Sequence, residues 1–164
     1  MTTVAIEEDF KQAMRRLATT IALITSGRGD SWAGMAATAV TSIAGSPPTI
    51  LISVNRNASL HPVVMESRRF CVNLLSERHR DLVGIFSGAK KGAERFESGL
   101  WTASDEGLPV LGDAVASLIC SVVSTVDVAT HSLFIGEVDR IANHPEIDPL
   151  IWVDGRFGSA SLLE

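Results

Sequence analysis

At 164 residues the chain has the usual length of one domain, and we expect a single domain over residues 1–164. Its 14 basic and 19 acidic side chains give a net charge of −5, which opposes binding to nucleic acid or to anionic membranes. No run of about 18 apolar residues occurs, and the first residues are acidic where a secretion signal is apolar. We therefore expect a soluble, cytoplasmic protein. Because 46% of the residues are hydrophobic, we also expect a ligand or second subunit to cover apolar surface.

Residues with helical or alternating apolar spacing predict an order of elements along the chain. In chain order these are a helix at 6–18, strands at 21–26 and 32–37, a strand at 49–55, a helix at 60–67, a strand at 69–74, a helix at 77–86 with Ser76 as its N-cap, a loop at 87–96, strands at 118–128 and 132–141, and a last strand at 151–153. Turn residues at 27–30 and 129–131 join two of these pairs as hairpins.

Strands joined mainly by hairpins, with few helices between them, argue against a doubly wound parallel sheet. The sequence therefore predicts a mainly β fold with peripheral helices, built as a closed antiparallel barrel. Two cysteines, Cys71 and Cys120, each fall inside an apolar strand and are far apart in sequence. We interpret them as reduced core thiols of a cytosolic protein, and we expect no disulfide and no metal site.

The segment at 34–42 (Gly-Met-Ala-Ala-Thr-Ala-Val-Thr-Ser) combines small side chains with hydroxyl groups. Such a surface lets a flat ligand approach the backbone, whose N–H groups can favour negative charge on that ligand. The alternative is a strand with small residues where two sheets approach closely. From composition alone this structural alternative is favoured.

Lys90, Lys91 and Arg95 form the densest basic cluster of an otherwise acidic chain, and they lie in a glycine-containing loop at a predicted helix end. Such a cluster can hold an anionic ligand. It can equally be a solvated helix terminus, where basic side chains oppose the negative end of the helix dipole. The residues alone leave both interpretations open.

The segment at 54–62 joins a strand to a helix, and such a turn can present Ser59 and free backbone N–H groups to a phosphate. Helix capping by Asn57 or Ser59 is the commoner use of these residue types. His131 lies at the tip of the predicted hairpin, where functional groups are frequent, although an exposed histidine often has no role.

Taken together, the sequence resembles the short-chain flavin reductases, a family with an FMN-binding split-barrel fold. The resemblance extends from about Phe10 to Gly158. The matching segments, in family order, are 34–42, Pro47-Pro48, 53–55, 70–75, 86–88, Arg95-Phe96, Leu108-Pro109, 134–138 and 154–158.

This resemblance implies a six-stranded antiparallel split barrel that dimerises, with the flavin near the subunit interface and a nicotinamide stacked over its ring. Residues matched to the lining of the flavin ring are Thr38, Ala39, Val40, Thr41 and Ser42. Residues matched to positions near the ribityl chain and phosphate are Asn55, Ser59, Ser87, Lys91 and Arg95, with Lys90 as an alternative to Lys91. His131 and Phe157 match positions beside the nicotinamide.

The sequence departs from the family pattern at two of these positions. Ala129-Thr130 replaces the Gly-Asp of the family's Gly-Asp-His turn, and Phe157 stands where tyrosine is frequent. These changes put the geometry of the turn and carboxylate support for His131 in question.

The activity implied by the resemblance is hydride transfer from NADH or NADPH to FAD or FMN. The hydride passes directly from the nicotinamide to the flavin, so the protein supplies geometry and polarity. Reduced flavin then goes to a separate monooxygenase. The alternatives are a non-catalytic flavin-binding or interaction protein on the same barrel, and an oxidase of the pyridoxamine-phosphate type, which calls for more basic residues than we find.

Overall fold

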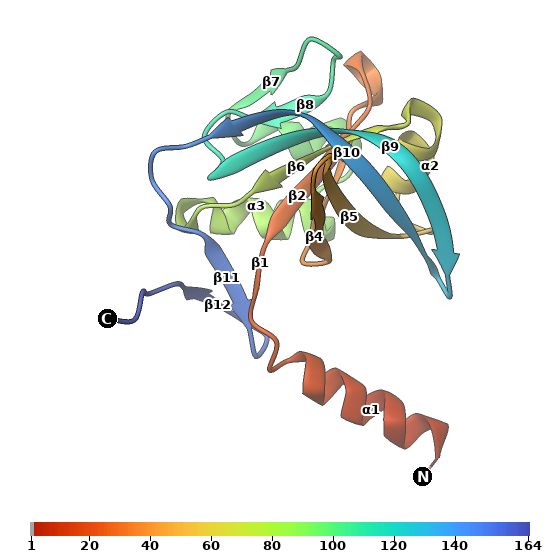
Figure 1. Cartoon of the computed structure of the whole chain (residues 1–164), viewed down its shortest axis with the longest axis vertical. Coiled ribbons are helices and arrows are strands. Elements are labelled where there is room, and N and C mark those ends of the chain that lie inside the picture. Colours follow the sequence, from red (N-terminus) through yellow and green to blue (C-terminus); the bar gives the residue numbers. More distant parts are fainter. Residues whose placement is uncertain (1) are drawn as a thin grey trace.

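The computed structural model describes residues 2–164 and is dominated by a curved antiparallel sheet of seven strands in the order β3-β2-β6-β9-β10-β5-β4 (Figure 1). Its strands are β2 (Ala22–Ser26), β3 (Ala33–Ala37), β4 (Val40–Gly45), β5 (Pro48–Asn55), β6 (Arg69–Leu74), β9 (Ala116–Val128) and β10 (His131–Asn143). Two smaller sheets contain β7 (Trp101–Ala103) with β8 (Pro109–Leu111), and β1 (Thr19–Thr20) with β11 (Leu150–Val153) and β12 (Arg156–Ser159).

The helices lie around this sheet. They are α1 (Thr3–Met14), α2 (Leu60–Ser67) and α3 (Arg80–Gly84), with short 3-10 or π-helical segments η1 (Gly29–Ser31), η2 (Glu77–His79), η3 (Ile85–Ala89) and η4 (Gly92–Glu97). Helix α2 packs against β2 and β3. Within residues 2–164 no helix is both long and apolar enough to cross a membrane.

The two edges of the seven-stranded sheet are consecutive in the chain. Strand β3 is one edge, β4 is the other, and only Thr38 and Ala39 lie between them. The sheet must therefore curl until its edges approach at these two residues. The described strands β3 and β4 do not pair with each other, so the barrel is split and the prediction of a closed barrel was wrong. The main sheet also has seven strands, where the resemblance implied six.

Buried apolar side chains of residues 2–164 form three clusters. One lies inside the curved sheet around Phe70 and Phe134, one lies beneath α3 around Phe86 and Leu150, and a smaller one contains Cys71 and Leu108. The fully buried Asn73 of β6 links its strand to β2 and β8. Its amide donates to the Leu23 carbonyl at 3.0 Å and its oxygen accepts from the Leu111 N–H at 2.9 Å, which satisfies polar groups that would otherwise be costly to bury.

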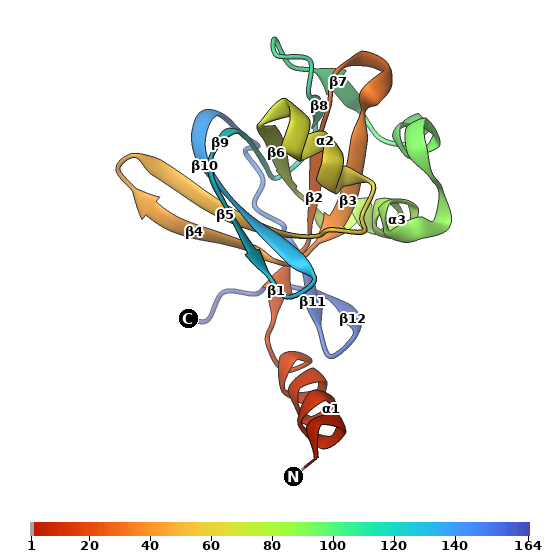
Figure 2. The same cartoon turned by 90° about the vertical axis from the view of Figure 1, so that its right-hand side faces the viewer.

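Helix α1 extends away from the body of the molecule (Figures 1 and 2). At its C-terminal end Arg15 donates to the Asp154 side chain and carbonyl, at 3.0 and 3.1 Å. Asp154 and Gly155 both have positive φ, as the turn of the β11–β12 hairpin requires. The arginine therefore joins the helix to this turn, and its hydrogen bond lowers the pKa of the Asp154 carboxyl.

Most of the predicted elements are confirmed, including both hairpins and the bounds of α2 and β6. The predicted helix at 77–86 is instead divided among η2, α3 and η3. Strands β1, β4, β7, β8 and β12 were missed. Cys71 and Cys120 are buried and free in neighbouring strands, and burial raises the pKa of both thiols to about 12.

Candidate functional site

The segment at 34–42, which is rich in small residues, lies at the split of the barrel. Thr38 and Ala39 connect the two sheet edges, and the Ser53 N–H donates to the Ala39 carbonyl at 3.2 Å. Val40, Thr41 and Ser42 begin β4, whose outer edge faces away from β5. Apart from the half-buried Val40, these residues are exposed. Because β4 is an edge strand, its outer N–H and C=O groups are open to a ligand or a second chain.

A cavity of about 230 Å³ opens beside this segment. It is lined by Ile21, Ala36, Ala37, Thr38, Val83, Ser87 and Trp152. Two of the predicted site residues, Thr38 and Ser87, therefore meet at one cavity although they are far apart in sequence. Alanines on one wall leave room for a flat group, and the two hydroxyls add hydrogen-bonding capacity.

Arg95 joins the two segments that line this cavity. Its Nη1 donates to the Gly34 carbonyl at 2.6 Å, and its Nε donates to the Lys90 carbonyl at 2.9 Å. Gly34 is in the strand that contributes Ala36, and Lys90 follows the turn that contributes Ser87. The guanidinium has more N–H donors than these two bonds use. Arg95 is thus held in place with capacity left for an anion.

Aromatic packing fixes the position of this loop. The Phe96 ring lies 5.2 Å from Phe86, 5.1 Å from Trp101 and 5.3 Å from Trp32, measured between ring centroids. Phe86 also covers Gly34, where an added Cβ would stand 2.8 Å from the ring. Only glycine permits this close approach of the π-helical turn η3 to β3. Arg95 is therefore presented by a loop that is packed against aromatic side chains.

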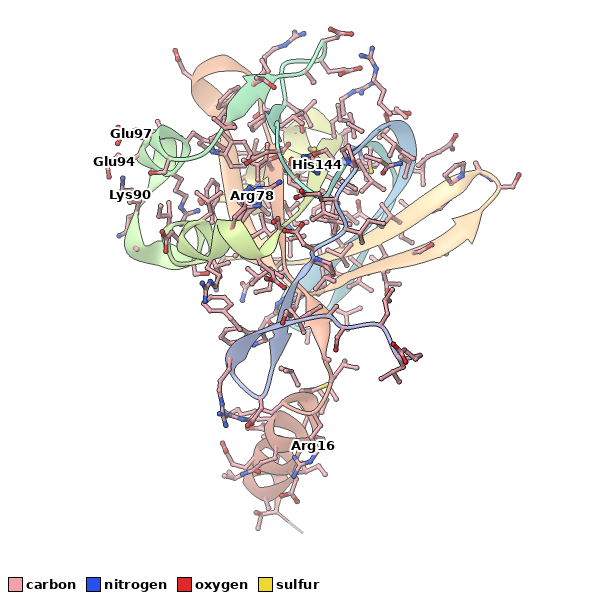
Figure 3. All side chains as sticks on the ribbon, turned by 90° about the vertical axis from the view of Figure 1, so that its left-hand side faces the viewer. Arg16, Arg78, Lys90, Glu94, Glu97 and His144 are labelled. Atoms are coloured by element: carbon pink, nitrogen blue, oxygen red, sulfur yellow. The ribbon has the colours of Figure 1, made fainter. Side chains whose placement is uncertain are left out.

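The two lysines of the basic cluster have different environments. The Lys90 amine lies 3.8 Å from the Glu97 carboxylate, and Figure 3 shows Lys90 gathered with Glu94 and Glu97 at this end of the molecule. Lys91 is exposed. Because Lys90 already has an acidic neighbour, Lys91 is the better placed of the two lysines to bind an anionic ligand.

A second group of predicted residues lies where β5 ends. Asn55 and His131 are directly opposite each other in the β5–β10 pair. The Asn55 side chain accepts from the Asn57 N–H at 2.8 Å and so fixes the turn into α2. Within residues 2–164, Ser59 precedes α2 without a capping hydrogen bond from its side chain. The capping interpretation of Ser59 was therefore wrong, and its exposed hydroxyl is available to a ligand.

His131 is the first residue of β10, immediately after the turn formed by Ala129 and Thr130. Its Nδ1 lies 2.9 Å from the Thr130 hydroxyl, and its side chain is half-buried. The threonine that replaces the family's aspartate is thus the side chain that contacts this imidazole. It can orient the ring but brings no negative charge.

Phe157 lies on β12 outside the cavity, and its ring makes an edge contact with Trp152 at 5.3 Å. Trp152 is the neighbour that reaches the cavity wall beside Thr38. Sequence reasoning missed this tryptophan. Its position opposite Phe157 in a two-residue Asp-Gly hairpin was a signal that could have identified it.

The predicted residues thus form two groups linked by β5. The first surrounds the cavity with Thr38, Ser87 and the adjacent Arg95, and the second contains Asn55, Ser59 and His131. The Ser53 N–H bonds to the Ala39 carbonyl, and Asn55 follows Ser53 by two residues, which is about 7 Å along a strand. The second group therefore lies near the Thr38–Ala39 end of the first. The donors fit a flavin nucleotide, because they combine hydroxyls and small residues with the cationic Arg95 and Lys91.

The chain is similar over most of its length to known proteins. A model of the flavin reductase like domain matches residues 14–161. A protein of Rhizobium rhizogenes named FMN reductase (NADH) RutF 2 is 38% identical over 151 residues, covering 92% of this chain and 87% of that protein.

Two solved structures are also similar. The flavin reductase of the styrene monooxygenase from Pseudomonas putida S12 is 30% identical with a TM-score of 0.84, covering 95% of this chain and 99% of that one. The NADH:FAD oxidoreductase SgcE6 from Streptomyces globisporus, in complex with NAD and FAD fragments, is 25% identical with a TM-score of 0.89, covering 98% and 96%. The chain therefore belongs to the family of flavin reductase like domains.

Proposed function

We propose that this flavin reductase, acting as a single domain, transfers hydride from NADH to FMN and releases the reduced flavin to a separate monooxygenase. The observation that carries this proposal is the cavity at the barrel split, where Thr38 and Ser87 meet beside Arg95. The cavity offers no carboxylate, thiol or imidazole among its lining residues that would serve as a nucleophile or general base. A site of this kind is suited to stacking two planar groups.

Each group of residues has a distinct task in this proposal. The bound flavin supplies the acceptor for the hydride. Thr38 to Ser42 line its ring, and the open backbone edge of β4 stabilises negative charge there. Ser87, Lys91 and Arg95 bind its phosphate, with Asn55 and Ser59 near its ribityl chain. His131 orients the nicotinamide, and Phe157 supports Trp152 at the cavity wall.

NADH oxidation is expected to depend on added free flavin and to need no organic substrate. The measurement is the fall in nicotinamide absorbance when the purified protein is mixed with NADH or NADPH and with FMN, FAD or riboflavin. We expect the combination of NADH and FMN to be the fastest, because the 38% identical relative is named for these two substrates. A protein that binds FMN but never oxidises either nicotinamide would support the non-catalytic alternative.

The partner in this proposal is a flavin-dependent monooxygenase. The similar P. putida protein is the reductase of a styrene monooxygenase. In such a pair the reductase supplies reduced flavin, and a second protein uses it. The expected carrier is free reduced flavin, because the residues assigned to the ring are exposed at the split, apart from the half-buried Val40.

We also propose a cytoplasmic homodimer. Helix α1 contributes no buried residue in the described chain, although Phe10 is 62%, Met14 45% and Leu17 58% exposed. The outer half of β9 likewise exposes Val123, Val126 and Val128. Apolar surfaces of this extent on a small protein indicate a protein partner. A second copy of the chain would cover them and also complete the flavin site at the open edge.

The cytoplasmic location is supported by the reduced, buried thiols.

The expected mass in solution is therefore twice the 17.5 kDa of one chain. Light scattering at micromolar concentration measures it directly. The double substitution of Phe10 and Met14 by serine should shift the protein toward monomer because it removes apolar area from α1. A fully active monomer of the unaltered protein would refute both the dimer and a flavin site shared between subunits.

A further inference from the structure

The turn that presents His131 is held by a side chain from another strand end. Arg56, directly after β5, directs its guanidinium at two carbonyls of the turn: Nη1 donates to the His131 carbonyl at 3.3 Å, and Nη2 donates to the Ala129 carbonyl. The Arg56 N–H also donates to the Thr130 carbonyl at 3.0 Å. One residue therefore bonds to three consecutive carbonyls, from Ala129 to His131.

This turn has a conformation that its own sequence disfavours. Ala129 has a φ of 49°, in the left-handed region where a Cβ is strained. When the first residue of a two-residue hairpin loop has a positive φ, that residue is usually glycine. Here alanine occupies the position, so the local sequence does not by itself favour the observed turn. The bonds from Arg56 oppose this disadvantage.

The turn conformation determines where the imidazole lies. His131 begins β10, and its Nδ1 contacts the Thr130 hydroxyl within the turn, so the ring moves with the turn backbone. A separate chain of hydrogen bonds fixes the strand just beyond it. The Ser132 hydroxyl donates to Asp127 at 2.6 Å and lies 2.8 Å from the Nε2 of His61 on α2. The base of the hairpin is thus fixed independently, whereas the turn itself depends on Arg56.

We propose that Arg56 is a positioning residue, which holds the Ala129–His131 turn in its left-handed conformation so that His131 is oriented toward the nicotinamide. This inference rests on the role of His131 proposed above. The guanidinium replaces what glycine supplies in a Gly-Asp-His turn. Lysine cannot replace it, because a single ammonium does not have the planar fork that spans two carbonyls.

The test compares three kinds of variant with FMN and NADH. Arg56→Ala removes the fork, Arg56→Lys keeps the charge, and Arg56→Ala with Ala129→Gly restores the turn by another route, since glycine adopts positive φ freely. Arg68→Ala is the matched control. Arg68 is an exposed arginine that also bridges to the β9–β10 hairpin, through the Thr125 hydroxyl at 3.2 Å, but it does not contact the turn.

Arg56→Ala is expected to raise the KM for NADH and lower the anaerobic hydride-transfer rate, with a combined loss of about fivefold to tenfold, the size of one or two hydrogen bonds. The Kd for FMN should change less than about twofold. Arg56→Lys should lose nearly as much, Arg56→Ala/Ala129→Gly should recover most of the loss, and Arg68→Ala should match the unaltered protein. Recovery by glycine is a result that a general loss of folding does not produce.

Arg56→Ala in the His131→Ala background separates this inference from the role of His131. If Arg56 acts through His131, removing it there should cause no further loss, because the two effects are coupled. Additive losses would overturn the inference while leaving His131 in its role. An effect of Arg56→Ala without any effect of His131→Ala would instead refute the role of His131, and with it this inference. Unchanged NADH kinetics in Arg56→Ala, or no recovery by Ala129→Gly, would also overturn it.

Discussion

Replacing Arg95 by alanine is expected to weaken FMN binding by about 1–3 kcal/mol, the range for a hydrogen bond to a charged group. The guanidinium is held between the carbonyls of Gly34 and Lys90, both in segments that line the cavity, and it keeps N–H donors free for a phosphate. Flavin fluorescence titration measures the change in Kd. Riboflavin, which lacks the phosphate, should bind more weakly to the unaltered protein and should be little affected by Arg95→Ala.

Two further variants separate the charge of Arg95 from its place in the loop. Arg95→Lys keeps the positive charge but loses the fork to the two carbonyls, so it should retain only part of the FMN affinity. Arg140→Ala removes the same charge from the far part of β10, where the side chain pairs with Glu106 at 3.3 Å, and should leave FMN binding unchanged. An equal loss with riboflavin and FMN in Arg95→Ala would mean that the residue only shapes the loop.

Replacing His131 by alanine is expected to slow turnover with NADH roughly 10-fold while leaving flavin affinity nearly intact. Hydride transfer requires no proton abstraction, so the loss should be below the ~10²–10⁴ typical of a general acid or base. His131→Asn keeps a hydrogen-bonding group beside Thr130 and should lose less. The measurement is the anaerobic stopped-flow rate of flavin reduction as a function of NADH concentration.

The matched control for His131 is His144→Ala. His144 is another partly exposed histidine, and its Nδ1 accepts from the Glu146 N–H at 3.1 Å in the segment after β10. It should have normal kinetics. If His131→Ala also keeps its hydride-transfer rate and its nicotinamide affinity, His131 is a turn residue without a role in the reaction.

The sequence determined the elements whose signals are local. Alternating apolar residues and short turns predicted the hairpins β2–β3 and β9–β10, because each such pair needs only neighbouring residues to form. The ordered set of short segments also identified the family. It predicted Thr38 and Ser87 as site residues, which the fold brings to one cavity.

Elements that depend on distant partners were not predictable in this way. Strand β4 is exposed along almost its whole length, so it has no alternation of buried and exposed residues, and its strand conformation comes from pairing with β5. The helix expected at 77–86 is divided into shorter segments, and the side chain of its last residue, Phe86, packs on Gly34 of β3. The closed barrel was wrong because edge pairing depends on backbone geometry that side-chain patterns do not record.

The sequence by itself therefore determined the family, the hairpins and the types of side chain available to a flavin nucleotide. Only the tertiary structure decided how those side chains are used. It directs Lys90 toward Glu97, holds Arg95 on the Gly34 carbonyl, and brings Trp152 to the cavity. Each of these contacts joins different elements of the fold, so it depends on how those elements pack together and leaves no periodic signal in the local sequence.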